Sequence, residues 1–198
     1  DVYKRQINNL IEKVEKIFIG GGMAFTFFKA QGLEIGKSLL EEDRVEMAEK
    51  LLKKAQSKEV EISLPVDVVC ARDLSEDSET KTVPVDQIPS DMAGYDIGPE
   101  TLKKYKQDLS DCRTIVWNGP MGVFEKENFA TGTIELAKAL AELTSEGATT
   151  IIGGGDSASA VKKAGVGDRL SHISTGGGAS LEFLEGKTLP GLAALTDK

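Results

Sequence analysis

Runs of three glycines, each placed directly after a short strand-like segment, most constrain what this chain can fold into. They occupy residues 20–22, 153–155 and 176–178, and a related turn at residues 118–122 follows another strand-like segment. Glycines at the end of a strand let the backbone approach a ligand, and a following helix offers free N–H groups and the positive end of its dipole to an anion. Several such turns on one sheet predict a surface that binds phosphate groups.

Strand-like and helix-like segments alternate along the chain. Strand patterns lie at residues 17–19, 61–65, 66–71, 114–117, 149–152 and 171–174. Helix patterns lie at residues 7–16, 23–30, 41–56, 99–109, 133–143, 157–164 and 179–184. The acidic stretch 73–91 contains two prolines and is expected to be a loop. Such alternation produces right-handed crossovers and parallel strands, whose ligands bind at the carboxyl ends. We therefore expect an α/β fold, a Rossmann-like three-layer parallel sheet with helices on both faces.

Charge and composition narrow the class of protein. The chain has 198 residues, enough for one domain and somewhat few for two. A net charge of -8 argues against a nonspecific nucleic-acid binder, and no apolar run approaches the roughly 18 residues of a membrane span. Cys70 and Cys112 are far apart and are expected to be reduced thiols of a cytosolic protein. The single histidine, His172, excludes a metal site built from several histidines.

The segment Gly153-Gly154-Gly155-Asp156-Ser157 is the sharpest motif. Its glycines can let a phosphate approach the backbone at the start of the following helix. The carboxylate of Asp156 would repel a bare phosphate, so a nucleotide there favours Mg²⁺ as the bridging ion. The alternative is that Asp156 only caps the helix.

Two nucleotide-binding motifs of other folds were tested against this loop. Gly153, Gly155 and Ala158 fit a loose G-x-G-x-x-A pattern, but the next strand, at residues 171–175, contains no Asp or Glu to bind a ribose. An NAD-dependent oxidoreductase is therefore disfavoured. No glycine turn is followed by Gly-Lys-Ser or Gly-Lys-Thr, so a Walker A loop is also missing.

Other residues leave two interpretations open. Residues 174–180 form a second turn into a helix, which is either a site for a phosphoryl group or a tight packing turn. Glu125 is either a ligand for ribose hydroxyls or a surface carboxylate. We expect His172 to be structural rather than a catalytic base, and Trp117 to belong to the core.

In their order along the chain, these motifs resemble the phosphoglycerate kinase family, specifically its C-terminal nucleotide-binding domain. The resemblance covers residues 7–198 and rests on six segments, residues 20–27, 64–67, 96–100, 116–125, 153–157 and 171–180. It implies a reversible reaction of glycolysis, in which a phosphoryl group passes from 1,3-bisphosphoglycerate to MgADP and the products are 3-phosphoglycerate and ATP. It also implies that this reaction takes place in the cytoplasm. It also implies that the parent enzyme is a monomer that binds neither nucleic acid nor a membrane.

The resemblance implies one set of residues that contact ADP or ATP. They are Gly21, Gly22, Leu39, Gly94, Asn118, Glu125, Gly153, Gly154, Gly155, Asp156 and Ser157. The first four residues line the adenine side of the nucleotide site, and the residues of the 153–157 loop contact the phosphates.

Within the same resemblance, Asp156 holds Mg²⁺ through the nucleotide, and Glu125 binds the ribose with help from Asn118. The catalytic assignment falls on Gly176, Gly177 and Gly178. They would provide the helix start that stabilises the phosphoryl group in transfer.

The chain also departs from the family's pattern. Residues 1–6 carry no pattern that leads into the next helix and are expected to be an expression or sequencing scar. We expect the family's N-terminal domain, its first inner strand and the lysines after that strand to be missing from this chain. Tyr3 stands about where the second lysine should be, and we do not expect Lys4 to substitute for it. We therefore expect a fragment that supplies the nucleotide half of the site, is inactive alone and is marginally stable. A module that binds a nucleotide without chemistry is the other function considered.

Overall fold

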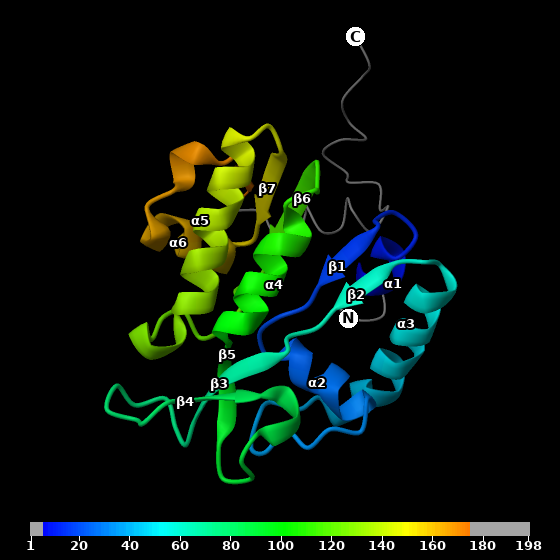
Figure 1. Cartoon of the computed structure of the whole chain (residues 1–198), viewed down its shortest axis with the longest axis vertical. Coiled ribbons are helices and arrows are strands. Elements are labelled where there is room, and N and C mark those ends of the chain that lie inside the picture. The colour runs from blue at the N-terminus through cyan, green and yellow to red at the C-terminus, as the bar shows by residue number, and fades with distance from the viewer. Residues whose placement is uncertain (1–5, 175–198) are drawn as a thin grey trace.

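The computed structural model describes residues 6–174, in which short parallel sheets are flanked by helices (Figure 1). Strand β1 (Lys16–Phe18) pairs in parallel with β2 (Glu61–Ser63). A second parallel sheet contains β6 (Thr114–Asn118), β7 (Thr149–Gly153) and β8 (His172–Ser174), in that order. The prediction of an α/β fold with parallel strands and flanking helices is confirmed.

A third sheet is antiparallel, with β3 (Asp67–Ala71) between β4 (Lys81–Pro84) and β5 (Ala93–Ile97). The prediction that residues 73–91 form a loop is wrong for β4. Pro84 ends an edge strand, where its missing N–H costs no ladder bond. The sequence pattern did not indicate β5, because Gly94 and Asp96 are weak strand formers and this strand depends on its burial against β3.

The helices of the described residues mostly follow the predicted pattern. They are α1 (Asn8–Leu10), α2 (Met23–Ala30), α3 (Val45–Ser57), α4 (Pro99–Leu109), α5 (Thr131–Ser145) and α6 (Gly155–Ala164), with 3₁₀ turns at Glu42–Arg44, Val85–Gln87, Glu127–Phe129 and Gly167–Arg169. Both α2 and α4 begin and end at the predicted residues. No helix in this part of the chain is long and apolar enough to span a bilayer. The helix predicted at residues 179–184 lies outside the described residues.

The prediction of a helix over residues 7–16 is wrong for most of that range. The α-helical residues are only Asn8–Leu10, and Lys16 already belongs to β1. The N–H of Glu61 donates to the carbonyl of Glu15 over 2.9 Å, so pairing with β2 begins where the helix was expected to continue. Tertiary pairing therefore overrides the helical spacing of the apolar residues.

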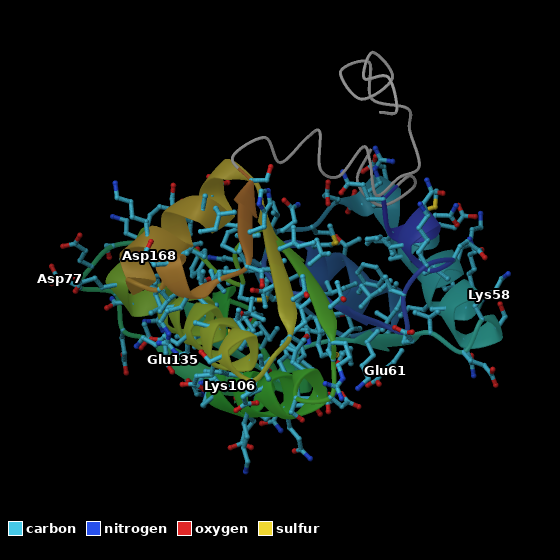
Figure 2. The ribbon with its side chains drawn as sticks, turned by 90° about the horizontal axis from the view of Figure 1, so that it is seen from above. Lys58, Glu61, Asp77, Lys106, Glu135 and Asp168 are labelled. Atoms are coloured by element: carbon cyan, nitrogen blue, oxygen red, sulfur yellow. The ribbon has the colours of Figure 1, made fainter. Side chains whose placement is uncertain are left out.

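Two apolar cores are present in the described residues. In the first, α2 and α3 pack on β1, β2 and β3, and Phe27 and Phe28 are fully buried. In the second, α4, α5 and α6 pack on β6 and β7, and Trp117 is buried there as predicted. On the outer surface, Lys106 of α4 pairs with Glu135 of α5 over 3.2 Å (Figure 2).

Within residues 6–174, no strand pairing connects β1 and β2 to β6–β8. Helix α4, which packs in the second core, also contacts the first sheet. The hydroxyl of the fully buried Tyr105 lies 2.7 Å from the carbonyl oxygen of Ile19 and 3.0 Å from that of Ser63. The Tyr105 ring packs edge-on against Phe18, with 5.1 Å between centroids. Lys104 donates to the hydroxyl of Ser63 over 2.7 Å. These contacts hold the first parallel sheet against α4.

We predict that Tyr105→Phe lowers the free energy of unfolding by about 1 to 3 kcal/mol, because a buried carbonyl loses its hydrogen-bond donor. Urea unfolding followed by circular dichroism measures the change. Tyr95→Phe is the matched control, since the structure records no hydrogen bond of the Tyr95 hydroxyl to a described residue and the expected change is below about 0.5 kcal/mol. Equal effects of the two substitutions would contradict the bridging role of Tyr105.

Candidate functional site

The start of α6 has the geometry of an anion site. Strand β7 ends at Gly153, and Gly154 is the N-cap residue of α6, with φ 94° and ψ 150°. The first hydrogen bond of the helix runs from the N–H of Ala158 to the carbonyl of Gly154, so the three preceding N–H groups have no partner within the helix. Gly155 and Asp156 in this first turn are exposed. The alternative that Asp156 caps the helix is wrong, because the cap position belongs to Gly154.

The turn after β6 lies directly beside this loop. Asn118 is in register with Gly153, and a Cβ on Gly154 would lie 2.8 Å from Oδ1 of Asn118. The N–H of Gly119 donates to Oγ of Ser157 over 2.7 Å, and Ser157 is fully buried. The Ser157 hydroxyl therefore ties the two loops together. The backbone N–H groups of the exposed Gly155 and Asp156, rather than the Ser157 side chain, are the groups suited to a phosphate.

Three of the four residues expected on the adenine side lie close together. A Cβ on Gly22 would lie 2.6 Å from Cδ2 of Leu39, and the Leu39 side chain is 65% exposed. The N–H of Gly21 donates to the carbonyl of Met121 over 3.0 Å, which joins the first glycine run to the 118–122 turn. An exposed apolar side chain beside glycines offers apolar surface against which a heterocyclic base can pack.

Gly94 lies behind this surface rather than on it. It is buried in β5, where its N–H donates to Oγ of Ser38 over 2.9 Å. The ring of Phe25 occupies the space that a side chain at this position would need. The structure thus brings Gly94 next to the adenine-side residues while covering it.

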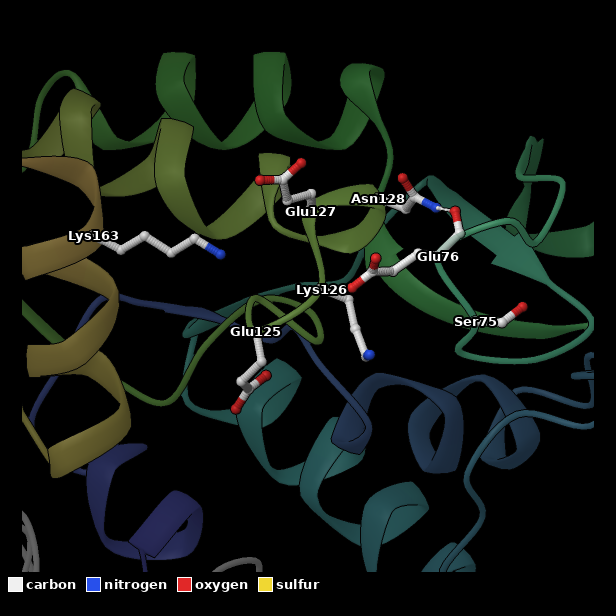
Figure 3. A pocket seen from close by; sticks show the side chains of 7 residues that line it. All are labelled: Ser75, Glu76, Glu125, Lys126, Glu127, Asn128 and Lys163. Atoms are coloured by element: carbon white, nitrogen blue, oxygen red, sulfur yellow. Dashed lines mark hydrogen bonds between the residues drawn. The ribbon is translucent and has the colours of Figure 1, made fainter.

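Glu125 is exposed and lines an open, polar pocket of about 400 Å³ (Figure 3). The other lining residues are Ser75, Glu76, Lys126, Glu127, Asn128 and Lys163. Lys163 comes from α6 and donates to the carbonyl of Phe124 over 2.7 Å, which places a cation beside the Glu125 segment. No sequence motif indicates Lys163, because only the packing of α6 brings it to this pocket. The glycine loops do not line this pocket, so the pocket is not part of the predicted phosphate surface.

The remaining predictions concern His172, the third glycine run and a metal site. His172 is exposed at the start of β8. Gly176, Gly177 and Gly178 lie outside the described residues. No cluster of three or more His, Cys, Asp or Glu side chains that could hold a metal is found in residues 6–174. With a single carboxylate at the loop, Asp156 fits a cation that a nucleotide's phosphates bind as well, rather than a cation held by the protein alone.

The comparisons with known proteins agree with one another. The family model for phosphoglycerate kinase matches residues 4–187. The phosphoglycerate kinases of Thermosynechococcus vestitus and Prosthecochloris aestuarii are each 60% identical over 191 residues, which cover 96% of this chain and 48% of the relative. The chain therefore spans about half the length of the curated relatives that it matches.

Solved structures give the same result. The structure of phosphoglycerate kinase from Coxiella burnetii matches with a TM-score of 0.91 at 46% identity, over 96% of this chain and 48% of that one. The phosphoglycerate kinase of Pyrococcus horikoshii matches with a TM-score of 0.81 at 34% identity, over 97% and 48% of the two chains.

We predict that Gly154→Ala lowers the free energy of unfolding by about 3 kcal/mol or more, because its φ and ψ belong to a region that is essentially restricted to glycine and a Cβ would collide with Asn118. Gly165→Ala at the other end of α6 is the matched control. Gly165 also has a positive φ, 69°, but a Cβ there has no atom within 4 Å, and the expected cost is about 1 to 2 kcal/mol. Denaturant unfolding of both variants measures the difference, and a Gly154→Ala variant no less stable than Gly165→Ala would refute the strained loop.

Proposed function

The chain belongs to the phosphoglycerate kinase family, and we propose that it supplies the nucleotide half of that enzyme's active site. The reaction is the reversible transfer of a phosphoryl group between 1,3-bisphosphoglycerate and MgADP, with 3-phosphoglycerate and ATP as products. This assignment carries the further proposals of a glycolytic role in the cytoplasm and of a monomeric parent enzyme. The relatives are twice as long as the matched region, so the phosphoglycerate is assigned to the other half of the enzyme.

The observation that carries the proposal is the start of α6. Its first turn holds three N–H groups without partners in the helix, and it is exposed at Gly155 and Asp156, where it carries a single carboxylate. Dipoles of this kind stabilise the phosphates of a nucleotide without moving during the reaction. Bound Mg²⁺ would neutralise phosphate charge, and Asp156 is the residue positioned to share it.

The neighbouring segments supply the rest of the nucleotide site. Gly21, Gly22 and Leu39 offer the surface for the base, and Gly94 supports that surface from behind. Asn118 lies against the phosphate loop, and Glu125 is the acceptor for ribose hydroxyls. Phosphoryl transfer depends mainly on positioning and charge neutralisation, which an assembly of backbone donors provides. Gly176, Gly177 and Gly178 remain the proposed stabilisers of the group in transfer.

Calorimetric titration of the chain with ADP in the presence of Mg²⁺ tests the nucleotide site. We expect binding that weakens about tenfold in Asp156→Ala and also when Mg²⁺ is removed, because the carboxylate and the phosphates share the ion. Asp168→Ala is the control. Asp168 is an exposed aspartate in the 3₁₀ turn Gly167–Arg169, which follows the C-terminal end of α6, and its removal should leave affinity unchanged (Figure 2). Absence of MgADP binding by the unaltered chain would refute the proposed function.

A coupled assay for ATP separates the nucleotide site from the whole reaction. We expect the 198-residue chain to form no ATP from 1,3-bisphosphoglycerate and MgADP, because it spans only half the length of its relatives. A full-length relative at the same concentration serves as the positive control. Measurable ATP formation by the pure chain would contradict the division of the active site between two halves. Binding of MgADP without ATP formation is equally the behaviour of a module that binds a nucleotide without chemistry. Adding the half of a full-length relative that this chain does not match distinguishes the two.

A further inference from the structure

The turn between Asn118 and Glu125 is held from beneath by buried groups outside the proposed site. The N–H groups of Met121 and Gly122 both donate to Oγ1 of Thr133, over 3.0 and 3.2 Å. Thr133 is fully buried in the first turn of α5. The position of this turn is therefore set by the start of α5.

The start of α5 is in turn held by Asp96 of β5. The N–H of Gly132 donates to Oδ2 of Asp96 over 2.8 Å, and the N–H of Ile97 donates to Oδ1 over 2.9 Å. A side chain on either Gly122 or Gly132 would collide with Oδ1 of Asp96. The carboxyl group thus lies between the 118–125 turn and α5, and two glycines allow both to approach it.

Asp96 is an unusual group to bury. It is 4% exposed, and burial raises its pKa to about 7, against the opposing effect of the bonds from Gly132 and Ile97. A carboxylate in such surroundings costs folding free energy unless its hydrogen bonds are well made. Its two N–H donors come from β5 itself and from α5, so those bonds fix the helix start relative to the sheet.

The same turn also connects to the other glycine loops. Its Met121 carbonyl accepts the N–H of Gly21, and the Gly119 N–H donates to Ser157 of the phosphate loop. The N–H of Val123 donates to the carbonyl of Tyr95, next to Asp96. Three separate segments of the proposed nucleotide site therefore share one buried support.

Asp67 provides an internal comparison. Its carboxylate accepts the N–H groups of Glu100 and Thr101, over 3.1 and 2.7 Å, at the start of α4. It is also buried, at 7% exposure, and lies on β3. Its recorded hydrogen bonds go to α4 and not to the 118–125 turn, so it fixes a helix without supporting the proposed site.

We propose that Asp96 and Thr133 are positioning residues for the nucleotide site, which set the spacing between Asn118 beside the phosphate loop and Glu125 at the ribose position. Neither residue is expected to touch the nucleotide, since both are buried beneath the turn. The assignment rests on the proposed function. It predicts that loss of either group weakens nucleotide binding and loosens the turn, beyond any general loss of stability.

Substitutions at Thr133 test the hydroxyl directly. Thr133→Val keeps the shape and removes the acceptor, whereas Thr133→Ser keeps the acceptor. We expect Thr133→Val to weaken MgADP binding about tenfold and to speed amide hydrogen exchange at Met121 and Gly122 about tenfold or more, as for the loss of buried hydrogen bonds. Thr133→Ser should stay within about twofold of the unaltered chain on both measures.

Substitutions at the two aspartates test the carboxyl group. The comparison is Asp96→Asn with Asp67→Asn, at a pH about one unit above the Asp96 pKa, where its carboxyl is mostly ionised. Both variants should melt at a lower temperature. Well below the two melting temperatures, only Asp96→Asn should weaken MgADP binding, about tenfold, and speed exchange at the turn.

The outcomes separate this assignment from the proposed function. Binding by the unaltered chain that neither Thr133→Val nor Asp96→Asn weakens would overturn the positioning role alone. The same holds if Asp67→Asn weakens binding as much as Asp96→Asn does, because the effect would then follow stability. If the unaltered chain does not bind MgADP, the proposed function is overturned, and with it the nucleotide role of Asp96 and Thr133. In that case, unchanged amide exchange in Thr133→Val would also show that Thr133 does not hold the 118–125 turn.

Discussion

The hydroxyl of Tyr105, buried between the carbonyls of Ile19 and Ser63, is the interaction on which the arrangement of the described residues depends. The two parallel sheets share no strand pairing there, and α4 is a helix that packs in the second core and also bonds to the first sheet. Packing alone is weakly directional, whereas a buried hydroxyl that must find an acceptor fixes register and distance. The first glycine run also lies directly against the turn that follows β6, because the N–H of Gly21 donates to the carbonyl of Met121.

The glycine runs are unequal in their surroundings. Gly154 and Gly155 lead into a helix whose first three N–H groups have no partner within the helix, and Asp156 is exposed beside them, an arrangement that favours an anion with its cation. The run at residues 20–22 packs closely against Met121 and Leu39, and this contact favours an apolar base over a phosphate. Repeated local sequence therefore does not imply a repeated role, because the partners that each run meets come from distant parts of the chain.

The sequence was most informative where local and tertiary preferences agree. Both α2 and α4 begin and end at the residues that their periodicity and the Pro99 start signal predict, and β6 and β7 differ from the prediction by one residue. It failed where they conflict. Residues 11–16 have helical spacing but leave the helix and enter a strand, and β5 forms from weak strand formers because burial against β3 stabilises it. Among the site residues, the sequence indicated the 153–157 loop but not the contacts of Asp96 and Thr133. These two residues are far from that loop along the chain and are connected to it through the 118–125 turn.

The amino-acid sequence by itself determined the α/β class, the order of most elements, the glycine turns at strand ends and the family to which they point, because these follow from residue types and short spacings. Only the tertiary structure decided how the strands divide among sheets, which aspartates lie buried at helix starts and which backbone groups the proposed site can offer to a ligand. Those features depend on contacts between residues far apart in the chain. Their energies come from burial and hydrogen bonding that no local pattern records.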